Sequence, residues 1–299
     1  MDKGYLDLNG FFKEKFGEKV HKIALTLNAT CPNRDGTLST KGCLFCNEKG
    51  SGDFISTGDL HEQVFSQIAR VKLKYPNAKK FVAYFQNFSN TYGDVEYLEK
   101  CYMSLLEFEE IVAISIGTRA DCLSKDILEV LVRLREMRYI YVELGLQTIH
   151  EKSREFLNIG YPLSEFQKGL EALQFSGIDV VAHLIFGIPG ESLEEMLKSV
   201  EYLVKQSIWG VKFHHFYVSE RTGIEKYYKE SQFHLLTVEE YMQVLLASIK
   251  IIGKNCIVHR MSSDPDKKSL IAPIWTISKI EFLNQFHKAL RIEISKKKY

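Results

Sequence analysis

Several features that would place a chain in a special class are missing from this sequence. No apolar run approaches eighteen residues, which argues against a membrane-spanning helix, and the first residues lack the basic-then-apolar pattern of a secretion signal. The net charge is only +1, so no overall field attracts the protein to nucleic acid or to a membrane surface. Six unevenly spaced cysteines do not form a disulfide framework. Internal repeats and low-complexity segments are also missing. We therefore expect a cytoplasmic globular protein whose thiols stay reduced.

The pattern of apolar residues predicts an α/β fold. Short apolar runs alternate with longer amphipathic stretches, and we predict strands at residues 22–27, 80–85, 111–116, 139–144, 178–186 and 211–218. Six βα units in series predict a parallel sheet with right-handed crossovers, and six units instead of eight indicate an incomplete barrel. We expect a partial (β/α)6 barrel of the TIM type over residues 1–236. Residues 237–299 are expected to form a C-terminal α/β extension that closes it.

Three cysteines in one loop are the strongest chemical signal. Cys31, Cys43 and Cys46 follow the first predicted strand, where barrels carry their chemistry. Structural zinc normally takes four protein ligands, whereas an iron–sulfur cluster held by three cysteines leaves one iron free for a ligand. Zinc completed by His21 or Cys122 is the alternative, although the sequence has no second Cys-x-x-Cys pair.

The residues around these cysteines resemble radical S-adenosylmethionine (SAM) enzymes, most closely the YtqA/YhcC-like group, which is distantly related to the elongator catalytic subunit. The resemblance rests on Cys-Pro-Asn-Arg-Asp-Gly-Thr at 31–37, Gly-Cys-Leu-Phe-Cys at 42–46 and Gly-Ser-Gly-Asp-Phe at 50–54. The last of these favours the YtqA side, and the likeness extends over roughly residues 17–295. It implies that the cysteines hold a [4Fe–4S] cluster whose fourth iron binds SAM. One electron would then release a 5′-deoxyadenosyl radical, which takes hydrogen from the substrate.

The same resemblance implies which residues surround SAM. Residues 85–92 follow the second strand, in the place where many such enzymes contact the amino group of SAM. A polar turn with capping residues is the alternative for this segment. In the segment 183–191 two isoleucines could pack on the adenine, while a glycine permits close approach. The predicted SAM contacts are Gln86, Ser89, Asn90, Thr118, Glu143, Gln147, Ile185, Gly187 and Ile188.

Four side chains are predicted to be catalytic: Arg119, Glu143, Lys212 and His214. Arg119 could bind a carboxylate or phosphate through two hydrogen bonds with Asp121 orienting it, the alternative being a capping turn with an Arg–Asp pair. Glu143 lies in an apolar strand and needs a partner, and a buried pair with Arg119 is one possibility. Period-two alternation puts Lys212 and His214 on one face of the sixth strand. The histidine at 183 is interpreted as a satisfied core residue.

Some positions depart from the family pattern or have no assigned role. Ile159, Tyr161, Glu220 and Arg221 replace residues of different polarity or charge, so they can change the substrate. Cys101, Cys122 and Cys256 are isolated in the sequence and have no assigned role. Arg260, Asp264, Pro265 and residues 271–275 match a C-terminal family signature, which we expect to close the open barrel side and contact the substrate. The alternative is that Trp275 only docks the tail into the core.

The resemblance also implies a substrate and partners. Members of the YtqA side are linked to wobble uridines in tRNA, and the implied step converts 5-carboxymethylaminomethyl(2-thio)uridine to the 5-aminomethyl form. Arg119 could hold the carboxylate. A radical SAM enzyme acting on a small metabolite, or a non-catalytic zinc-binding interaction protein, are the alternatives. We expect SAM, tRNA and an electron donor such as flavodoxin or ferredoxin as partners, and no membrane. The oligomeric state stays open.

The N-terminal segment has two interpretations. Lys13, Lys15, Lys19 and Lys22 are mixed with three phenylalanines, at positions 11, 12 and 16. Such a segment could contact the phosphate backbone of a nucleic acid. Interleaved glutamates favour the alternative, an amphipathic helix with a solvated face. The lysines at 267, 268 and 296–298 are equally ambiguous.

Overall fold

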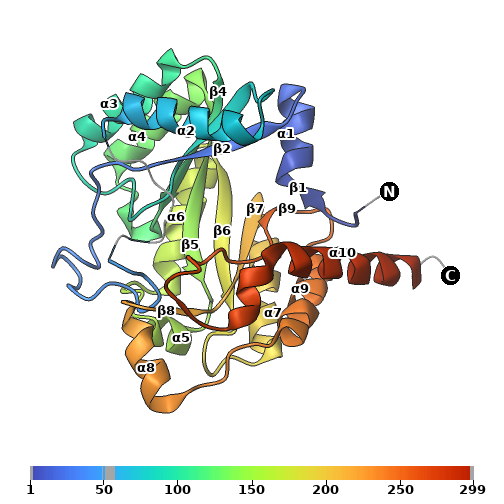
Figure 1. Cartoon of the computed structure of the whole chain (residues 1–299). Helices are drawn as coiled ribbons and strands as arrows, with labels where there is room; N and C mark the ends of the chain where they lie inside the picture. The colour runs from blue at the N-terminus through green and yellow to red at the C-terminus, as the bar shows by residue number, and fades with distance from the viewer. Residues whose placement is uncertain (1–2, 49, 51–57, 297–299) are drawn as a thin grey trace.

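One parallel sheet organises the computed structural model, which describes residues 3–48, 50 and 58–296. Its eight strands run in the order β1-β9-β7-β6-β5-β4-β3-β2, and every pair of neighbours is parallel (Figure 1). The strands are β1 (Leu6–Asp7), β2 (Val20–Leu25), β3 (Lys80–Phe85), β4 (Ile111–Thr118), β5 (Tyr139–Gln147), β6 (Asp179–Phe186), β7 (Gly210–His215) and β9 (Ile257–Arg260). The sheet curls into a partial barrel, which confirms the predicted fold class.

The sheet contains two strands more than the six predicted βα units supply. β9 belongs to the region expected to form the C-terminal extension, but it pairs with β7 and thereby joins the main sheet. The two-residue strand β1, too short for a period-two pattern, extends the edge beyond β9. A second, antiparallel sheet consists of β8 (Val218–Ser219) and β10 (Leu270–Ala272). The sheet of the barrel therefore takes strands from both ends of the chain.

Helices pack around the sheet. They are α1 (Leu8–Phe16), α2 (Leu60–Lys74), α3 (Val95–Ser104), α4 (Lys125–Met137), α5 (Glu151–Phe156), α6 (Leu163–Phe175), α7 (Leu193–Lys205), α8 (Gly223–Ser231), α9 (Val238–Ile252) and α10 (Lys279–Lys296). Short 3₁₀ turns occur at Leu105–Glu107, Ala120–Cys122 and Ile274–Ser278. Asp59, Ser192 and Thr237 begin α2, α7 and α9 with capping boxes, which satisfy free backbone N–H groups at the helix starts.

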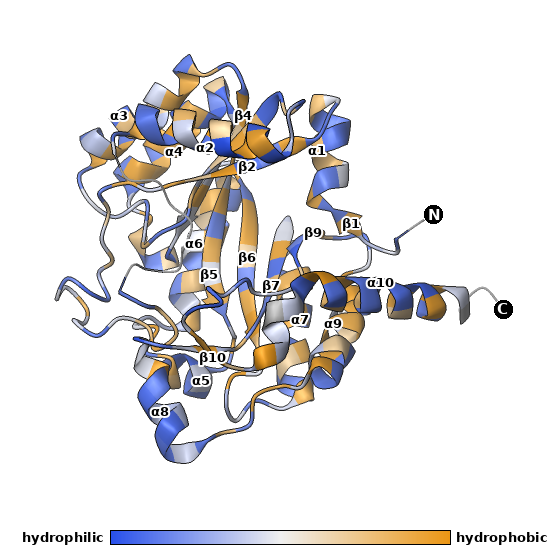
Figure 2. Cartoon of the chain, viewed as in Figure 1, coloured by the Kyte–Doolittle hydropathy of each residue, from blue (hydrophilic) through white to orange (hydrophobic). Residues whose placement is uncertain are grey.

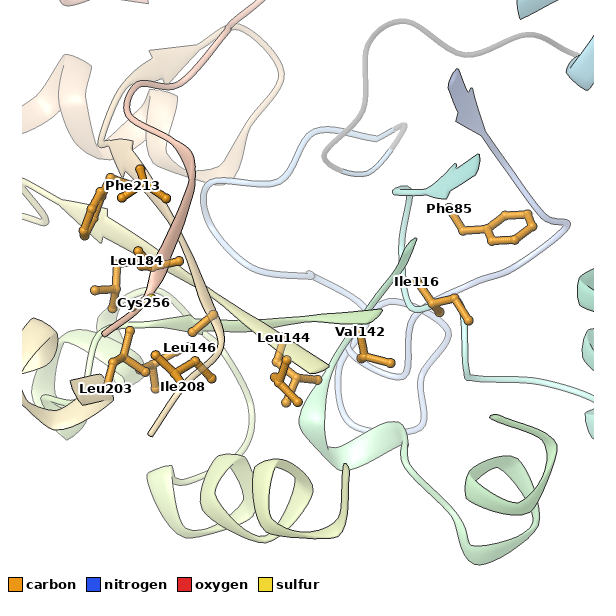
Figure 3. Packing of buried hydrophobic residues seen from close by; sticks show 14 of the residues in the cluster. Phe85, Ile116, Val142, Leu144, Leu146, Leu184, Leu203, Ile208, Phe213 and Cys256 are labelled. Atoms are coloured by element: carbon orange, nitrogen blue, oxygen red, sulfur yellow. The ribbon is translucent and has the colours of Figure 1, made fainter. Parts of the chain in front are cut away.

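The main core lies between the sheet and these helices. Alternate residues of each strand point outward, as Val142 and Leu144 of β5 do in Figure 3. Figure 2 shows hydrophobic colour concentrated along β5 and β6, whereas α8 is largely hydrophilic. Residues on the opposite face of each strand point into the barrel. Their side chains therefore form the interior in which a site can be built.

Aromatic side chains close the N-terminal end of the barrel, which we call the floor. The floor is formed by Phe12, Val20, Val82, Ala113, Tyr141 and Val181, with Phe11, Phe16, Tyr139 and Trp209 packed around them. Phe12 is only 2% exposed, and the Phe11 and Trp209 rings meet edge to face at 5.2 Å. The phenylalanines of α1 therefore pack into the floor, as expected for an amphipathic helix. The lysines of α1 and the turn after it remain on the surface.

The C-terminal segment packs against the barrel. The indole of Trp275 donates to the Leu236 carbonyl at 2.9 Å and its ring lies 4.5 Å from that of His215. Trp275 thus docks the tail into the core, while contact of the C-terminal signature with the substrate stays a prediction. At the other end of the chain, the Tyr5 hydroxyl lies 3.2 Å from His287 of α10.

Some residues named in the sequence analysis lie outside the described part of the chain. The segment Gly-Ser-Gly-Asp-Phe at 50–54 falls outside the described residues except for Gly50, and so do the lysines at 297 and 298. Among the described residues, none of the helices is sufficiently long and apolar to span a membrane.

Candidate active site

The cysteine loop lies at the C-terminal ends of the strands, which we call the mouth of the barrel. Cys31, Cys43 and Cys46 line one cavity of about 120 Å³. Arg34 holds the loop from inside by donating to the carbonyls of Cys46 at 3.1 Å and Asn47 at 2.6 Å. The strand order and the loop therefore bring the three thiols to a common cavity, as the spacing predicts.

A neighbouring segment supports the same loop. The Asn33 amide donates to the Asn158 carbonyl at 2.6 Å and reaches the Cys43 sulfur at 3.4 Å. In return, the Asn158 amide donates to the Gly42 carbonyl at 2.7 Å. Gly42 has φ +71°, and a Cβ there would lie 2.9 Å from the Arg34 side chain, so this position favours glycine. Asn158, which directly precedes the departures at Ile159 and Tyr161, thus stabilises the cysteine loop through hydrogen bonds.

The thiol environment suits a bound metal centre. Burial raises the pKa of Cys43, opposed by Arg119 and the Asn33 amide, and burial and Cys43 raise the pKa of Cys46 to about 12. A metal cation reverses this balance, because a coordinating thiol is deprotonated outright. Two arginines near the thiols, Arg34 and Arg119, favour the thiolate form as well.

The ligands proposed for the zinc alternative lie elsewhere. His21 packs against Tyr75, with ring centroids 4.7 Å apart. Cys122 lines a different cavity and its sulfur lies 3.8 Å from an Asp121 oxygen. Within residues 3–48, 50 and 58–296, no three His, Cys, Asp or Glu side chains are arranged to hold a single metal ion. Three thiols beside an open cavity fit a cluster that keeps one iron free.

Glu143 is the centre of the barrel interior. It is 1% exposed, and it accepts hydrogen bonds from the Ser115 hydroxyl at 2.9 Å, from His183 at 2.8 Å and from the Lys212 ammonium. Burial alone would raise the pKa of Glu143, but Lys212, His183 and Lys22 outweigh it and hold this pKa well below its usual range. The alternative in which Arg119 is the partner of Glu143 is wrong, because Lys212 compensates the charge of Glu143 and His183 donates a hydrogen bond to it.

Burial and the contact with Glu143 determine the protonation state and the tautomer of His183. Burial lowers the pKa of His183 to about 4, and Lys212 and Arg260 add to this while Glu143 opposes it. His183 is therefore neutral near pH 7. Because an ionised carboxylate only accepts, Nε2 carries the proton and Nδ1 is left as an acceptor. The His183 ring stacks on that of His214 at 5.2 Å, so these two histidines form a neutral polar surface.

Arg119 is already occupied within the protein. Its guanidinium makes two hydrogen bonds to Asp121, at 2.9 and 2.7 Å, and a third to the Ile159 carbonyl at 2.9 Å. Asp121 keeps the pKa of Arg119 above its ordinary value although burial opposes this. Of the two alternatives for Arg119, the structure therefore shows the pair with Asp121. Arg119 nevertheless lines the cysteine cavity.

The predicted SAM contacts fall into two groups. Those that line the cavities at the mouth are Gln86, Thr118, Glu143, Gln147 and Ile185. The others are packed inside the protein, so their role as SAM contacts stays a prediction; they are Ser89, Asn90, Gly187 and Ile188. Ser89 and Asn90 are fully buried and bond to Thr118 at 2.8 Å and to the Gly117 carbonyl at 2.8 Å.

The end of β5 is shaped toward the cavity. Gln147 has φ +63°, an uncommon conformation for a residue with a side chain, and the strand register shifts between Gly145 and Gln147. Such backbone strain is typical of functional positions. Gly145 and Gln147 both line the cysteine cavity.

A second cavity adjoins the first. It has a volume of about 200 Å³ and shares Phe45, Gln86, Gln147 and His183 with the cysteine cavity. The rest of its wall includes His214 of β7 and Arg260 of β9. This supports the expectation that the C-terminal segment lies against the mouth. A ligand that extends from the cysteines toward the second cavity would pass His183.

Several residues that line the cysteine cavity had no predicted role there, among them Phe45, Tyr84 and Tyr161. Tyr161, considered only as a departure, donates to the Gly145 carbonyl at 2.7 Å, and Arg119 lies 4.8 Å from its ring. The period-two pattern of β3 could have indicated Tyr84, because it lies two residues before Gln86. The departures Glu220 and Arg221 lie outside both cavities, after β8.

Sequence comparison decides the family. The profile of the radical SAM superfamily matches residues 30–203, more than half of the chain, and that of the radical SAM C-terminal domain matches residues 208–291. The chain belongs to the radical SAM superfamily. It is therefore an enzyme of the class that uses a [4Fe–4S] cluster and SAM, which confirms the predicted cofactors and overturns the zinc-protein alternative. When bound, these cofactors supply a carbon-centred radical that removes a hydrogen atom from a substrate.

Individual relatives agree with this membership. YtqA of Bacillus subtilis is 36% identical over 291 residues, covering 97% of this chain and 90% of YtqA, and YhcC of Escherichia coli K12 is 31% identical over 267 residues, covering 89% and 85%. A protein of Methanocaldococcus jannaschii named tRNA uridine(34) acetyltransferase is 27% identical over 156 residues, covering 51% of this chain and 28% of that protein. Among solved structures, Elp3 of Methanocaldococcus infernus superposes with a TM-score of 0.68 at 19% identity, covering 93% of this chain and 63% of Elp3. The last likeness shows the fold of the radical SAM enzymes.

Proposed function

We propose that this radical SAM enzyme acts on the wobble uridine of tRNA. The step converts 5-carboxymethylaminomethyl(2-thio)uridine to the 5-aminomethyl form. The observation that carries the substrate is the likeness over half of the chain to a protein named tRNA uridine(34) acetyltransferase. A C–H bond between an amine and a carboxylate is a suitable target for hydrogen-atom removal. The proposed surroundings are the cytoplasm, with a flavodoxin or ferredoxin as electron donor.

The conversion balances without a further oxidant. The carbon between the amine and the carboxylate loses one hydrogen atom and the resulting radical loses one electron, while the amine nitrogen loses one proton. The C=N bond that forms in this way then adds water. The C–N bond then breaks, leaving the aminomethyl group on the uridine and releasing the two-carbon piece as glyoxylate. SAM accepts the two electrons overall and ends as methionine and 5′-deoxyadenosine.

The residues of the chain support this step in different ways. Gln86, Thr118 and Gln147 offer neutral donors and acceptors to SAM from the wall of the cysteine cavity. His214 is a neutral group on the wall of the second cavity, suited to contact the substrate. Lys212 is 2% exposed and its ammonium is bound to Glu143, so we assign these two as positioning residues that fix His183.

Formation of 5′-deoxyadenosine tests this function when the reconstituted enzyme meets defined tRNA. The holoenzyme is incubated anaerobically with SAM and a reductant, together with tRNA that carries 5-carboxymethylaminomethyluridine. The matched control is the same tRNA with unmodified uridine. We expect cleavage of SAM that depends on the modified tRNA, and a lighter uridine in the digested nucleosides. Cleavage that is indifferent to tRNA would contradict the substrate and favour a small metabolite.

A further inference from the structure

Arg260 at the end of β9 differs from Arg119 because its charge has no partner. It lines the second cavity. Among residues 3–48, 50 and 58–296, none forms a hydrogen bond or an ion pair with its guanidinium, whereas Arg119 makes three hydrogen bonds. A guanidinium offers five N–H donors in a planar fork. An arginine that faces a cavity with all of them available is suited to bind a ligand.

The carboxylates near Arg260 are committed to other cations. Glu143 is bound to Lys212 and His183, and Asp264 of the second cavity is bound to Lys279 at 2.8 Å. Lys22 adds a further positive charge within electrostatic range of Arg260. Four cationic side chains therefore surround two carboxylates, an excess of positive charge that an anionic ligand would balance.

The histidines around the second cavity do not add to this excess of positive charge. Burial lowers the pKa of His215 to about 3, with Lys279 adding to the effect, and burial also holds the pKa of His214 well below its usual range. Both are neutral near pH 7. The Nε2 atom of His214 is buried and has no hydrogen-bond partner in the described part of the chain. A ligand in the second cavity could therefore meet a neutral polar group beside the positive charge of Arg260.

We propose that Arg260 binds an oxyanion of the substrate. On the function proposed above, on which this assignment rests, the oxyanion is the carboxylate of the carboxymethylaminomethyl group. The planar guanidinium matches a carboxylate through two parallel hydrogen bonds. Because the second cavity shares part of its wall with the cysteine cavity, a carboxylate held at Arg260 leaves the adjacent C–H bond on the side of the cysteines. Arg260 thus takes the role that the sequence analysis gave to Arg119. A phosphate of the RNA backbone is the other source of such an oxyanion.

The assignment is tested with two tRNA substrates that differ in one charge. One carries the carboxylate of 5-carboxymethylaminomethyluridine and the other carries the corresponding carboxamide. A hydrogen bond to a charged group contributes about 1.5–3 kcal/mol, so the holoenzyme should show a KM roughly 10- to 150-fold lower for the carboxylate. Arg260→Met should raise the KM for the carboxylate tRNA to that for the carboxamide. Arg260→Lys should restore part of the difference. Iron content and circular dichroism establish that each variant folds and is loaded.

A matched control is Arg133→Met, which removes an arginine that pairs with Glu99 at 2.7 Å outside both cavities. It should keep the preference for the carboxylate. If Arg260→Met leaves the KM values for both tRNAs unchanged, the inference is wrong while the proposed function stands. If Arg260→Met raises the KM for both tRNAs by the same factor, the oxyanion is a backbone phosphate and the carboxylate assignment is overturned.

If neither tRNA stimulates the wild-type enzyme, the proposed function fails and a simpler probe tests Arg260. Thermal unfolding of the holoenzyme is followed in inorganic phosphate and in chloride at equal ionic strength. A concentration-dependent rise of Tm in phosphate that Arg260→Met abolishes would support the anion site. An equal response of the wild type and of Arg260→Met would overturn it.

Discussion

The floor and the mouth of the barrel are filled with opposite kinds of side chain. At the floor, Phe12, Tyr141 and Trp209 pack on one another, and α1 covers that end of the sheet. At the mouth, the three cysteines and several polar side chains line two connected cavities. A single strand passes from one to the other: on β5, Tyr141 belongs to the floor, Glu143 to the middle and Gly145 to the mouth. Packing is complete at the floor, so binding is left to the mouth.

The middle of the barrel separates these two ends. Glu143 and Lys212 are both nearly inaccessible, and their charges compensate each other. The Lys212 ammonium also lies 4.4 Å from the centroid of the Tyr84 ring, which lines the cysteine cavity. A charged layer between an aromatic floor and an open mouth gives the cavity rigid walls. The comparison therefore predicts that changes at the mouth affect activity, changes at the floor affect stability, and changes in the middle affect both.

The largest effect is expected from the mouth. Cys43→Ser should abolish formation of 5′-deoxyadenosine and lower the iron content of the reconstituted protein, because the serine hydroxyl replaces a thiolate ligand of the cluster. The unfolding midpoint of the metal-free protein should change little. The measurements are product chromatography, iron analysis and thermal unfolding.

The matched control for that variant is Cys101→Ser, which changes a half-buried cysteine on α3 that lines neither cavity. It should retain the cluster and the activity. Equal activity of Cys43→Ser and Cys101→Ser would contradict the assignment of the cluster site to the mouth of the barrel.

The next effect is expected from the middle. Glu143→Gln leaves the buried Lys212 ammonium without its counter-charge, and removing one partner of a buried ion pair destabilises a protein by about 3–5 kcal/mol. The free energy of unfolding, measured in urea, should fall by that amount, and SAM cleavage should fall with it. Glu194→Gln, which breaks an exposed pair with Lys198, should leave the free energy of unfolding nearly unchanged, because solvent screens exposed ion pairs. Equal losses in these two variants would contradict a buried charged layer.

A comparable loss of stability, without loss of the cofactor site, is expected at the floor. Phe12→Ala removes a ring that is 2% exposed, and such truncations lower the free energy of unfolding by about 3–5 kcal/mol. Reconstituted Phe12→Ala should still bind the cluster and cleave SAM at low temperature. Loss of the iron site in folded Phe12→Ala would show that floor and mouth are not separable.

The smallest effect concerns acid stability in the middle. The pKa of His183 is about 4 in the folded protein, below the ordinary value of a free histidine near 6.5. Between these values the unfolded chain binds more protons than the folded one, so the stabilisation is present above about pH 6.5 and is lost as the pH falls toward 4. His183→Gln should make the free energy of unfolding less dependent on pH in this window. His234→Gln, at an exposed position, should keep the wild-type profile.

Much of this arrangement was accessible from the sequence. The spacing of Cys31, Cys43 and Cys46 indicated the cluster site, and the six longest strands followed from short apolar runs. The partners of Glu143 could have been found by the same reasoning. Adjacent parallel strands put His183 opposite Lys212 in register, and period-two alternation turns both toward the barrel interior. The interpretation of His183 as a satisfied core residue did not identify Glu143 as its partner.

Other features depend on contacts that local patterns do not contain. The pairing of β9 with β7 joins residues more than forty positions apart, and β1 has only two residues. The contrast between Arg119 and Arg260 depends on which carboxylates each one reaches in three dimensions. Asp121 is two residues from Arg119, so the sequence could suggest that pair. That Arg260 has no partner among the described residues can be seen only when all the residues around the second cavity are placed in three dimensions.

The most direct test of the account is the formation of 5′-deoxyadenosine by the anaerobically reconstituted wild-type protein with SAM and a reductant, measured together with its metal content. We predict about four irons per chain, as one [4Fe–4S] cluster requires, and 5′-deoxyadenosine that is absent from Cys43→Ser. Stoichiometric zinc in place of iron, without any SAM cleavage, would contradict the assignment of Cys31, Cys43 and Cys46 to a catalytic cluster.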